Sequence, residues 1–382
     1  MKLDKMKITS MVAILLSFTV IQGPVFARDT INIVGSSTVY PFSKSFGKRF
    51  SQITGFNKPK LESTGSGGGF RLFCEGVGTS FPDITNASRR MKAEELKTCA
   101  SNGAGEITEV LIGYDGVSVA TSALVEKFKF TDKDLYLALA KYVPNSEGKF
   151  EKNPYTSWKQ INPTFPDVQI KVFGPPPSSG TREAFSELAL GKGAKRYDFL
   201  NTLNKIAANE EAKINAIVNR QGIPDEYWNG VKQKKAEKAK GGDLFKALVY
   251  DLRDDGVFVE TGENDDLIVR ELVTNPNAIG IIGYGFLLEN SRKIHGSFVN
   301  EFEPTSKNIS EGNYPLSRGL YFYIKKAHIS IVPGIKEFAK GFLSRIEVGK
   351  GGYLEKNGLI TMDAATYTEV KARTNALENL KL

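Results

Sequence analysis

The sequence is poor in the residues that most enzymes use for metal binding and nucleophilic catalysis. It contains only two histidines, His295 and His328, and neither stands in a recognisable metal-ligand spacing. No Gly-x-Ser-x-Gly elbow accompanies its serines, and the stretch from Gly65 to Arg71 does not end in the Gly-Lys-Ser/Thr of a Walker A loop. We therefore expect a protein that is not an enzyme and that carries neither a cofactor nor a metal.

Long hydrophobic runs are also scarce, and the one exception lies at the N-terminus. Three lysines, Lys2, Lys5 and Lys7, precede an apolar stretch over residues 8–21, and Val25-Phe26-Ala27 is a small-residue cleavage pattern. This pattern predicts an export signal over residues 1–27, whereas the apolar run is short for a transmembrane anchor. Because no cysteine near it could carry a lipid, we expect a free periplasmic protein rather than a lipoprotein.

Only two cysteines occur, Cys74 and Cys99. In an exported protein two cysteines favour a disulfide over two free thiols, because the compartment is oxidising. Acidic residues are the minority among the charges, with 43 Asp and Glu against 51 Lys and Arg, which suits an anionic ligand. The basic run over residues 231–240 is typical of a solvated helix face, and we expect no nucleic-acid partner and no stable membrane insertion.

Strand-like and helix-like patterns alternate along the chain. Phe42, Phe46 and Phe50 share one face of a helix. The alternation predicts an α/β architecture with parallel sheets. Strands are expected at residues 30–34, 110–114, 117–120, 170–173 and 320–324, and helices near 91–100, at 182–189 and, as surface helices, within 197–252.

Three short stretches share a composition that favours anion binding. They are residues 35–41 (GSSTVYP), 63–71 (STGSGGGFR) and 178–182 (SSGTR), and each precedes an expected helix. A helix N-terminus presents unpaired N–H groups and a partial positive charge, serine and threonine add hydroxyl donors, and glycine lets backbone approach a ligand. Each stretch alone is also typical of a turn or a helix cap, but together they predict an oxyanion site.

These stretches resemble the loops of the periplasmic phosphate-binding proteins of the PstS type, the substrate-binding components of ABC phosphate importers. The resemblance extends over essentially the whole mature length. The three stretches match the family's first, second and fourth loops in chain order, and residues 86–89 (NASR) stand in the place of the third loop. It implies a type II periplasmic-binding fold, with two α/β lobes, central mixed sheets and a two-strand hinge. Lobe one would comprise residues 28–115 and 317–382, and lobe two residues 116–316.

The resemblance also implies a set of phosphate ligands, from four loops and one polar turn. Where many members have an aspartate that accepts the proton of hydrogen phosphate, this chain has Arg89, and some members share that arginine. The family's arginine before the fourth loop is replaced by Pro175, so Arg182 is its candidate substitute, and Asn264 or Asp265 is a candidate acceptor. The expected ligands are Ser37, Thr38, Val39, Ser66, Ser88, Arg89, Ser179, Gly180, Thr181, Arg182, Asn264 and Asp265.

The function implied is high-affinity binding of inorganic phosphate and its delivery to the permease of an ABC importer, by a monomer whose hinge closes around the anion. Donors at helix ends do not by themselves discriminate among tetrahedral oxyanions, so sulfate, molybdate, tungstate and an organic phosphate remain alternative ligands. A phosphatase-like enzyme is a further alternative, as is an adhesin or sensor that uses the same cleft.

Overall fold

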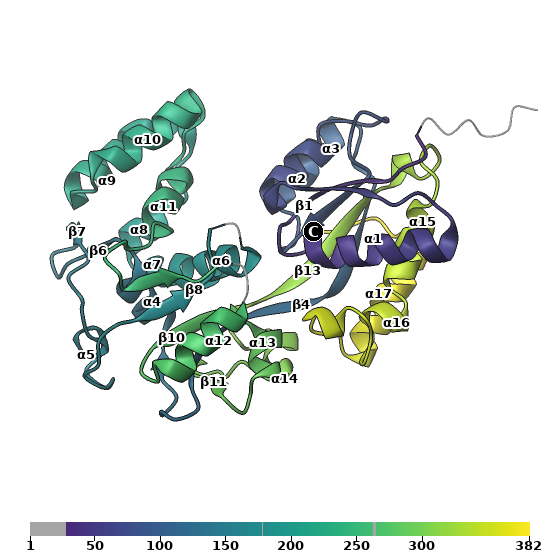
Figure 1. Cartoon of the computed structure of the whole chain (residues 1–382). Coiled ribbons are helices and arrows are strands. Elements are labelled where there is room, and N and C mark those ends of the chain that lie inside the picture. The colour runs from purple at the N-terminus through teal and green to yellow at the C-terminus, as the bar shows by residue number, and fades with distance from the viewer. Residues whose placement is uncertain (1–27, 178, 263–264) are drawn as a thin grey trace, which may run out of the picture.

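The structure, a computed structural model, describes residues 28–177, 179–262 and 265–382. The expected export signal, residues 1–27, lies outside the described residues. The chain has a mixed α/β fold in which one curled sheet runs through both halves of the molecule, in the order β2-β1-β3-β13-β4-β10-β8-β9, with β11 also paired to β4. Figure 1 shows β4 and β13 passing between the two halves.

The first half contains the N-terminal strands and the C-terminal part of the chain. Strands β1, β2 and β3 are mutually parallel, whereas β13 is antiparallel to both β3 and β4. The parallel pairing that the alternation predicts is present among β1, β2 and β3, and together with the antiparallel β13 it gives the mixed sheet that the resemblance implies, which is confirmed. The elements are β1 (Asn32–Gly35), α1 (Tyr40–Thr54), β2 (Lys60–Ser63), α2 (Gly65–Phe73), β3 (Ile84–Ala87), α3 (Ala93–Ser101), β4 (Ile107–Ser122), β13 (Ser317–Lys325), α15 (Ile335–Phe342), α16 (Arg345–Val348) and α17 (Ala364–Asn375).

The second half surrounds the other end of β4. Strands β8, β9 and β10 are parallel to one another, and β10 and β11 are antiparallel to β4. The strands are β5 (Lys129–Phe130), β6 (Tyr142–Pro144), β7 (Phe150–Lys152), β8 (Val172–Gly174), β9 (Phe258–Glu260), β10 (Ile279–Gly283), β11 (Ile294–Gly296) and β12 (Phe298–Val299). The helices are α4 (Asp132–Leu139), α5 (Trp158–Ile161), α6 (Gly180–Phe185), α7 (Gly191–Ala194), α8 (Asp198–Leu203), α9 (Glu211–Gln221), α10 (Asp225–Lys235), α11 (Gly241–Val249), α12 (Asp265–Thr274), α13 (Tyr284–Glu289) and α14 (Ser306–Ser310).

Strand β4 connects the two halves without a break. The two separate strands expected at 110–114 and 117–120 are one strand, which pairs with β13 from Ile107 to Gly116 and with β10 from Val117 to Thr121. The change of partner falls where the chain was expected to cross between lobes. The division into lobes at residues 115/116 and 316/317 stays a prediction.

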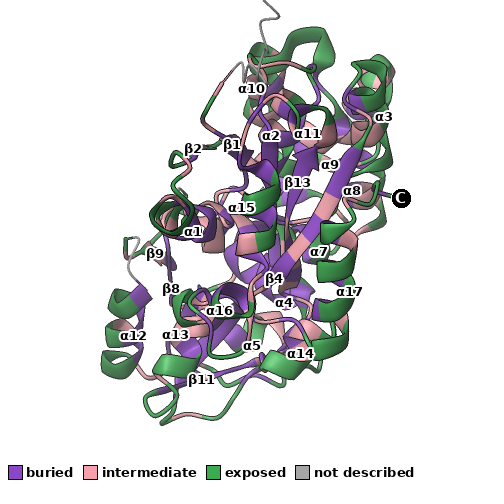
Figure 2. Cartoon of the chain, turned by 90° about the vertical axis from the view of Figure 1, so that its right-hand side faces the viewer, coloured by how far each residue is buried: buried purple, intermediate pink, exposed green. Residues whose placement is uncertain are grey.

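Each half has its own hydrophobic core. In the first, Phe46 and Phe50 of α1 contact Phe338 with ring centroids 5.1 and 5.4 Å apart, as the spacing of these phenylalanines on one helix face requires. In the second, the expected helices within 197–252 are present, but they are not only surface helices, since Leu244 and Leu248 of α11 are fully buried. Figure 2 shows buried strands between helices whose outer faces are exposed.

The expected disulfide joins Cys74 to Cys99 and is confirmed. It ties the C-terminal end of α2 to α3 within a small core that also contains Phe70, Phe73 and Met91.

Removing this disulfide should lower the stability of the protein without changing its site. The bond closes a loop of 25 residues in sequence separation, which restricts the unfolded chain. We expect the double change Cys74→Ala and Cys99→Ala to reduce the free energy of unfolding by about 3 kcal/mol, measured by urea unfolding in parallel with the oxidised and the reduced wild-type protein. A reduced wild type as stable as the oxidised protein would contradict this prediction.

Candidate anion-binding site

The first loop follows β1 and leads into α1. Gly35 has a φ of +122°, and a Cβ built on it would lie 2.1 Å from the carbonyl oxygen of Asn86, so only glycine fits here. The amide of Ser36 donates to that same carbonyl at 2.9 Å, which fixes the loop against the end of β3. Thr38 and Val39 therefore reach the beginning of α1, where Val39 is the N-cap residue.

The glycine-rich stretch forms the first turns of helix α2 rather than an open loop. A Cβ on Gly69 would lie 2.5 Å from Gly35 Cα and 2.5 Å from Thr85 Oγ1, so this glycine lets the helix lie directly on the sheet. Gly67, in contrast, lines the cleft described below, and a Cβ added to it would meet no atom within 4 Å. The glycines thus serve helix packing as well as access for a ligand, and Ser66 in the first turn reaches the cleft.

The second and third loops meet through two serines. The backbone N–H of Ser88 donates to Ser66 Oγ at 3.0 Å, and the two hydroxyl oxygens lie 3.1 Å apart. Ser66 and Ser88 are 6% and 3% exposed, so their donors and acceptors have to be satisfied within the site or by a ligand. The third loop lies directly after β3, and the β1–β3 pairing brings it beside the first loop.

The fourth loop comes from the second half of the molecule and contacts the first loop. Ser179 caps the helix that begins at Gly180, its Oγ accepting from the amide of Thr181 at 3.2 Å. Helix α6 continues through a π-helical segment, Ser186–Leu190, into α7. A Cβ on Gly180 would lie 2.8 Å from Thr38 Oγ1 and 3.0 Å from Thr38 Cα, so glycine is needed for this close approach.

Arg318 is the residue that connects these loops, and it is absent from the ligands expected from the sequence. It lies near the start of β13, is 9% exposed, and its guanidinium donates to Thr38 Oγ1 at 2.5 Å and to Ser88 Oγ at 3.0 Å. It also donates to the carbonyl oxygen of Gly180 at 3.3 Å, and its Nε lies 3.5 Å from Asp115 Oδ2. The sequence did contain a signal for this residue. Arg318 is a basic residue directly after Tyr314-Pro315-Leu316-Ser317, where the chain was expected to pass from lobe two back to lobe one.

The hydrogen bonds of Arg318 orient the hydroxyl groups around it. Arginine only donates, so the oxygens of Thr38 and Ser88 act as acceptors toward it and their own O–H groups remain able to donate. Ser66 Oγ accepts from the Ser88 amide, so its O–H can likewise point to the cleft or to Ser88. The arrangement places neutral donors beside a buried positive charge, which suits a small anion.

The two arginines that were expected as ligands, Arg89 and Arg182, are engaged elsewhere. Arg89 forms a bidentate pair with Glu95 at 2.6 and 2.9 Å and lies over the Phe70 ring. Burial disfavours the charge of Arg89, but its hydrogen bonds to Glu95 raise its pKa above the usual value.

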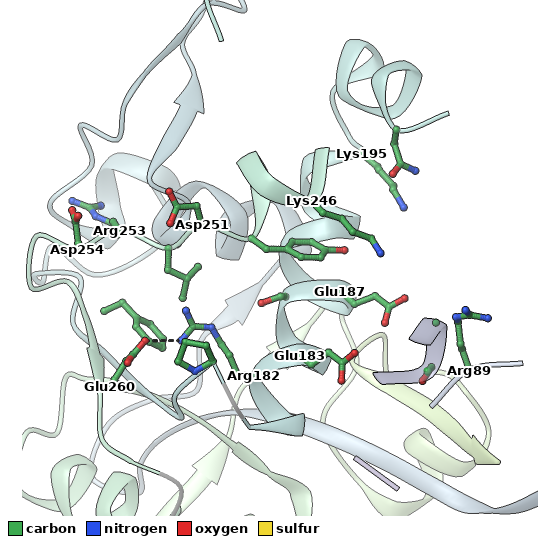
Figure 3. Close-up of a pocket in the computed structure, with 18 of the residues that line it drawn as sticks. Arg89, Arg182, Glu183, Glu187, Lys195, Lys246, Asp251, Arg253, Asp254 and Glu260 are labelled. Atoms are coloured by element: carbon green, nitrogen blue, oxygen red, sulfur yellow. Dashed lines mark ion pairs between the residues drawn. The ribbon is translucent and has the colours of Figure 1, made fainter. Parts of the chain in front are cut away.

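Arg182 points into the second half of the molecule. Its guanidinium donates to the carbonyl oxygen of Pro175 at 3.1 Å, lies over the Phe258 ring and forms an ion pair with Glu260 at 3.6 Å (Figure 3). Burial lowers the pKa of Arg182, against the opposing effect of Glu260. A direct role of Arg89 and Arg182 in anion binding stays a prediction.

The expected acceptors on the polar turn are placed in part. Asn264 lies outside the described residues. Asp265 is 6% exposed, begins α12, and accepts a hydrogen bond from the amide of Gly283 at 2.9 Å. This carboxylate therefore joins α12 to the end of β10, and its role toward an anion stays a prediction.

A polar cleft of about 780 Å³ opens beside the loops. Ser66, Gly67 and Arg89 line it from the first half, and charged side chains from the second half face them, among them Glu183, Glu187, Lys195 and Lys246. Figure 3 shows Glu183 and Glu187 directed toward the segment that carries Arg89, whereas Arg182 is directed toward Glu260. Burial lowers the pKa of Lys195 and raises that of Tyr250 in this cleft.

Two α/β halves that share a strand, with helix-opening loops from both halves meeting at one arginine, define the class of bilobal ligand-binding proteins. The chain belongs to the PBP superfamily, whose domain model matches residues 22–345. The family that the loops resemble is thereby confirmed as a relative: the phosphate-binding protein PstS of Staphylococcus saprophyticus is 26% identical over 348 residues, which cover 89% of this chain and 82% of that protein.

Solved structures share the fold. A possible phosphate-binding protein from Planctomyces limnophilus aligns with a TM-score of 0.65 and 23% identity, over 91% of this chain and 98% of that one. An ABC-type phosphate transport receptor from Vibrio cholerae aligns with a TM-score of 0.54 and 18% identity, over 86% of this chain and 99% of that one. The expected periplasmic-binding fold is confirmed. In the part of the chain that the structure describes, no helix is both long and apolar enough to cross a membrane.

Proposed function

We propose that this protein binds inorganic phosphate and delivers it to the permease of an ABC importer. The observation that carries the proposal is the position of Arg318, whose guanidinium contacts Thr38, Ser88 and the Gly180 carbonyl from three different loops. Its positive charge is nine-tenths buried, its carboxylate partners Asp115 and Glu187 lie 3.5 and 3.9 Å away, and the hydroxyl groups beside it can still donate, which suits a small anion. The names of the relatives in Staphylococcus and Vibrio point to phosphate as that anion.

The proposed mechanism is closure of two lobes around the anion. Ser66, Ser88, Thr38 and the first amides of α1 and α2 would receive the anion on lobe one, and Ser179, Gly180 and Thr181 would complete its shell from lobe two. Only the closed state makes both sets of contacts, so the ligand shifts the equilibrium toward closure. The closed form would then dock on the permease.

The remaining parts of the proposal concern where and with whom the protein acts. We propose a monomer, exported to the periplasm, whose residues 1–27 are cleaved and which carries no lipid anchor. It acts as a binding protein and not as an enzyme. Ser37, Val39, Arg89, Arg182, Asn264 and Asp265 remain proposed members of the site, in addition to the donors named above.

Calorimetric titration of the purified mature protein, stripped of bound anion, tests the proposal. We expect one phosphate per chain with a dissociation constant in the micromolar range or below, about −8 kcal/mol or stronger, and no heat from sulfate at pH 7. Molybdate, tungstate and a phosphate monoester serve as further probes. If one of these anions binds more tightly than phosphate, that anion takes the place of phosphate as the proposed ligand. If neither phosphate nor any of the other anions binds, the proposal of an anion site is contradicted.

A further inference from the structure

Glu183 is a carboxylate of the cleft that contacts the first loop from the opposite half of the molecule. Glu183 lies in α6, and its Oε2 accepts a hydrogen bond from Ser37 Oγ at 2.7 Å. A Cβ built on Gly65, the first residue of α2, would lie 4.0 Å from Glu183 Oε1. Glu183 forms no ion pair with a lysine or arginine in the described part of the chain, so its negative charge is directed at the first half (Figure 3).

A carboxylate beside an anion is unfavourable unless the anion still carries a proton. Phosphate and arsenate each retain at least one proton at neutral pH and can donate it to a carboxylate oxygen, whereas sulfate has none and would meet an uncompensated like charge. Such a repulsive contact discriminates more strongly than the neutral donors of the loops, which accept any tetrahedral oxyanion. A single carboxylate oxygen at this position is therefore enough to favour anions that carry a proton over anions that do not.

We infer that Glu183 is the proton acceptor of the site and that it limits the ligand to tetrahedral oxyanions that retain a proton at neutral pH. The inference rests on the proposed function and on the proposed movement of the two lobes. Because Glu183 belongs to the second half while Ser37 and Gly65 belong to the first, the contact exists only when the halves adjoin. Selection therefore takes place at closure: an anion without a proton can reach the lobe-one donors but opposes the approach of Glu183.

The neighbouring charges do not provide the same function. Glu187 is half exposed, and its Oε2 lies 3.9 Å from the Arg318 guanidinium, which neutralises it in part. Glu260 lines the same cleft but pairs with Arg182 on its far side. Asp115 lies 3.5 Å from Arg318 Nε. Glu183 is the carboxylate of this group that accepts a hydrogen bond from a hydroxyl group of the first half.

The test compares Glu183→Gln with the wild type for phosphate, arsenate and sulfate by calorimetry. Glutamine keeps an oxygen that accepts from Ser37 and adds an amide that can donate to an unprotonated anion. We expect the sulfate-to-phosphate affinity ratio to rise at least 100-fold, and sulfate to compact the variant in small-angle scattering although it does not compact the wild type. Ser37→Ala keeps the carboxylate of Glu183 and should therefore still reject sulfate.

Glu260→Gln is the matched control, because it removes the same charge from the same cleft and should leave the ratio within threefold of the wild type. Thermal unfolding of each variant shows that it is folded. A wild type that binds phosphate and rejects sulfate, with the same selectivity in Glu183→Gln, overturns the inference and leaves the proposed function in place. A wild type that binds sulfate as well as phosphate also overturns the inference, and one that binds no phosphate overturns both.

Discussion

Replacing Arg318 by glutamine is expected to weaken phosphate binding at least 100-fold. The change removes the buried positive charge that donates to Thr38 and Ser88, and it leaves Asp115 without its ion-pair partner. Loss of two charge-assisted hydrogen bonds to the groups that orient the ligand corresponds to about 3 kcal/mol or more. Arg318→Lys should recover only part of this loss, because a lysine has one point charge in place of a planar fork of donors.

Two further arginines make the test specific. Arg90→Gln is the matched control. Arg90 directly follows the third loop, residues 86–89, but it pairs with Glu109 at 2.9 Å. The phosphate affinity of this variant should stay within threefold of wild type. Arg89→Gln decides between the two arginine assignments, because Arg89 is the ligand that the family resemblance implies and Arg318 is the one that the geometry favours. Calorimetry on folded variants, checked by circular dichroism, measures the phosphate affinity of each of these variants. A larger loss in Arg89→Gln than in Arg318→Gln would contradict the present assignment.

The loops could be predicted from the sequence because their composition reflects local requirements. Glycines and hydroxyl residues before a helix indicate a helix N-terminus whatever lies around it, and the expected helix with Phe42, Phe46 and Phe50 on one face is α1. The disulfide followed from two cysteines and an oxidising compartment. The helix inferences need only residues that are neighbours in the sequence. The disulfide inference needs no choice between partners, because two cysteines allow only one pairing.

Arg318 and Glu183 could not be assigned in this way, because their roles depend on contacts between distant segments. Arg318 lies 280 residues after Thr38 and reaches it only through the pairing of β13 with β3 and β4. Glu183 lies 146 residues after Ser37 and meets it across the two halves. Similarly, nothing local shows that Gly69 is needed for packing on Gly35.

Gly180→Val is expected to weaken phosphate binding about 100-fold by preventing closure. A Cβ at this position would lie 2.8 Å from Thr38 Oγ1, 3.0 Å from its Cα and 3.1 Å from its amide nitrogen, and valine adds two methyl groups to this contact. The backbone of Thr38 cannot retreat easily, because its neighbour Ser36 is fixed to Asn86 and the loop leads directly into α1. The lobes would therefore stop short of the distance at which donors from both sides reach one anion.

The effect should be separable from stability and from loss of the donors themselves. Gly180 begins a helix, and in the proposed open form, with Thr38 withdrawn, an added side chain would have room, so the melting temperature of the ligand-free variant should not fall. Gly230→Ala is the control, because Gly230 lies in α10 with no atom within 4 Å of an added Cβ, and both its affinity and its compaction should match wild type. Small-angle scattering with and without phosphate measures closure: the wild type should compact and Gly180→Val should not. If Gly180→Val binds phosphate tightly and still compacts, the contact between Thr38 and Gly180 does not form part of the closed, ligand-bound state.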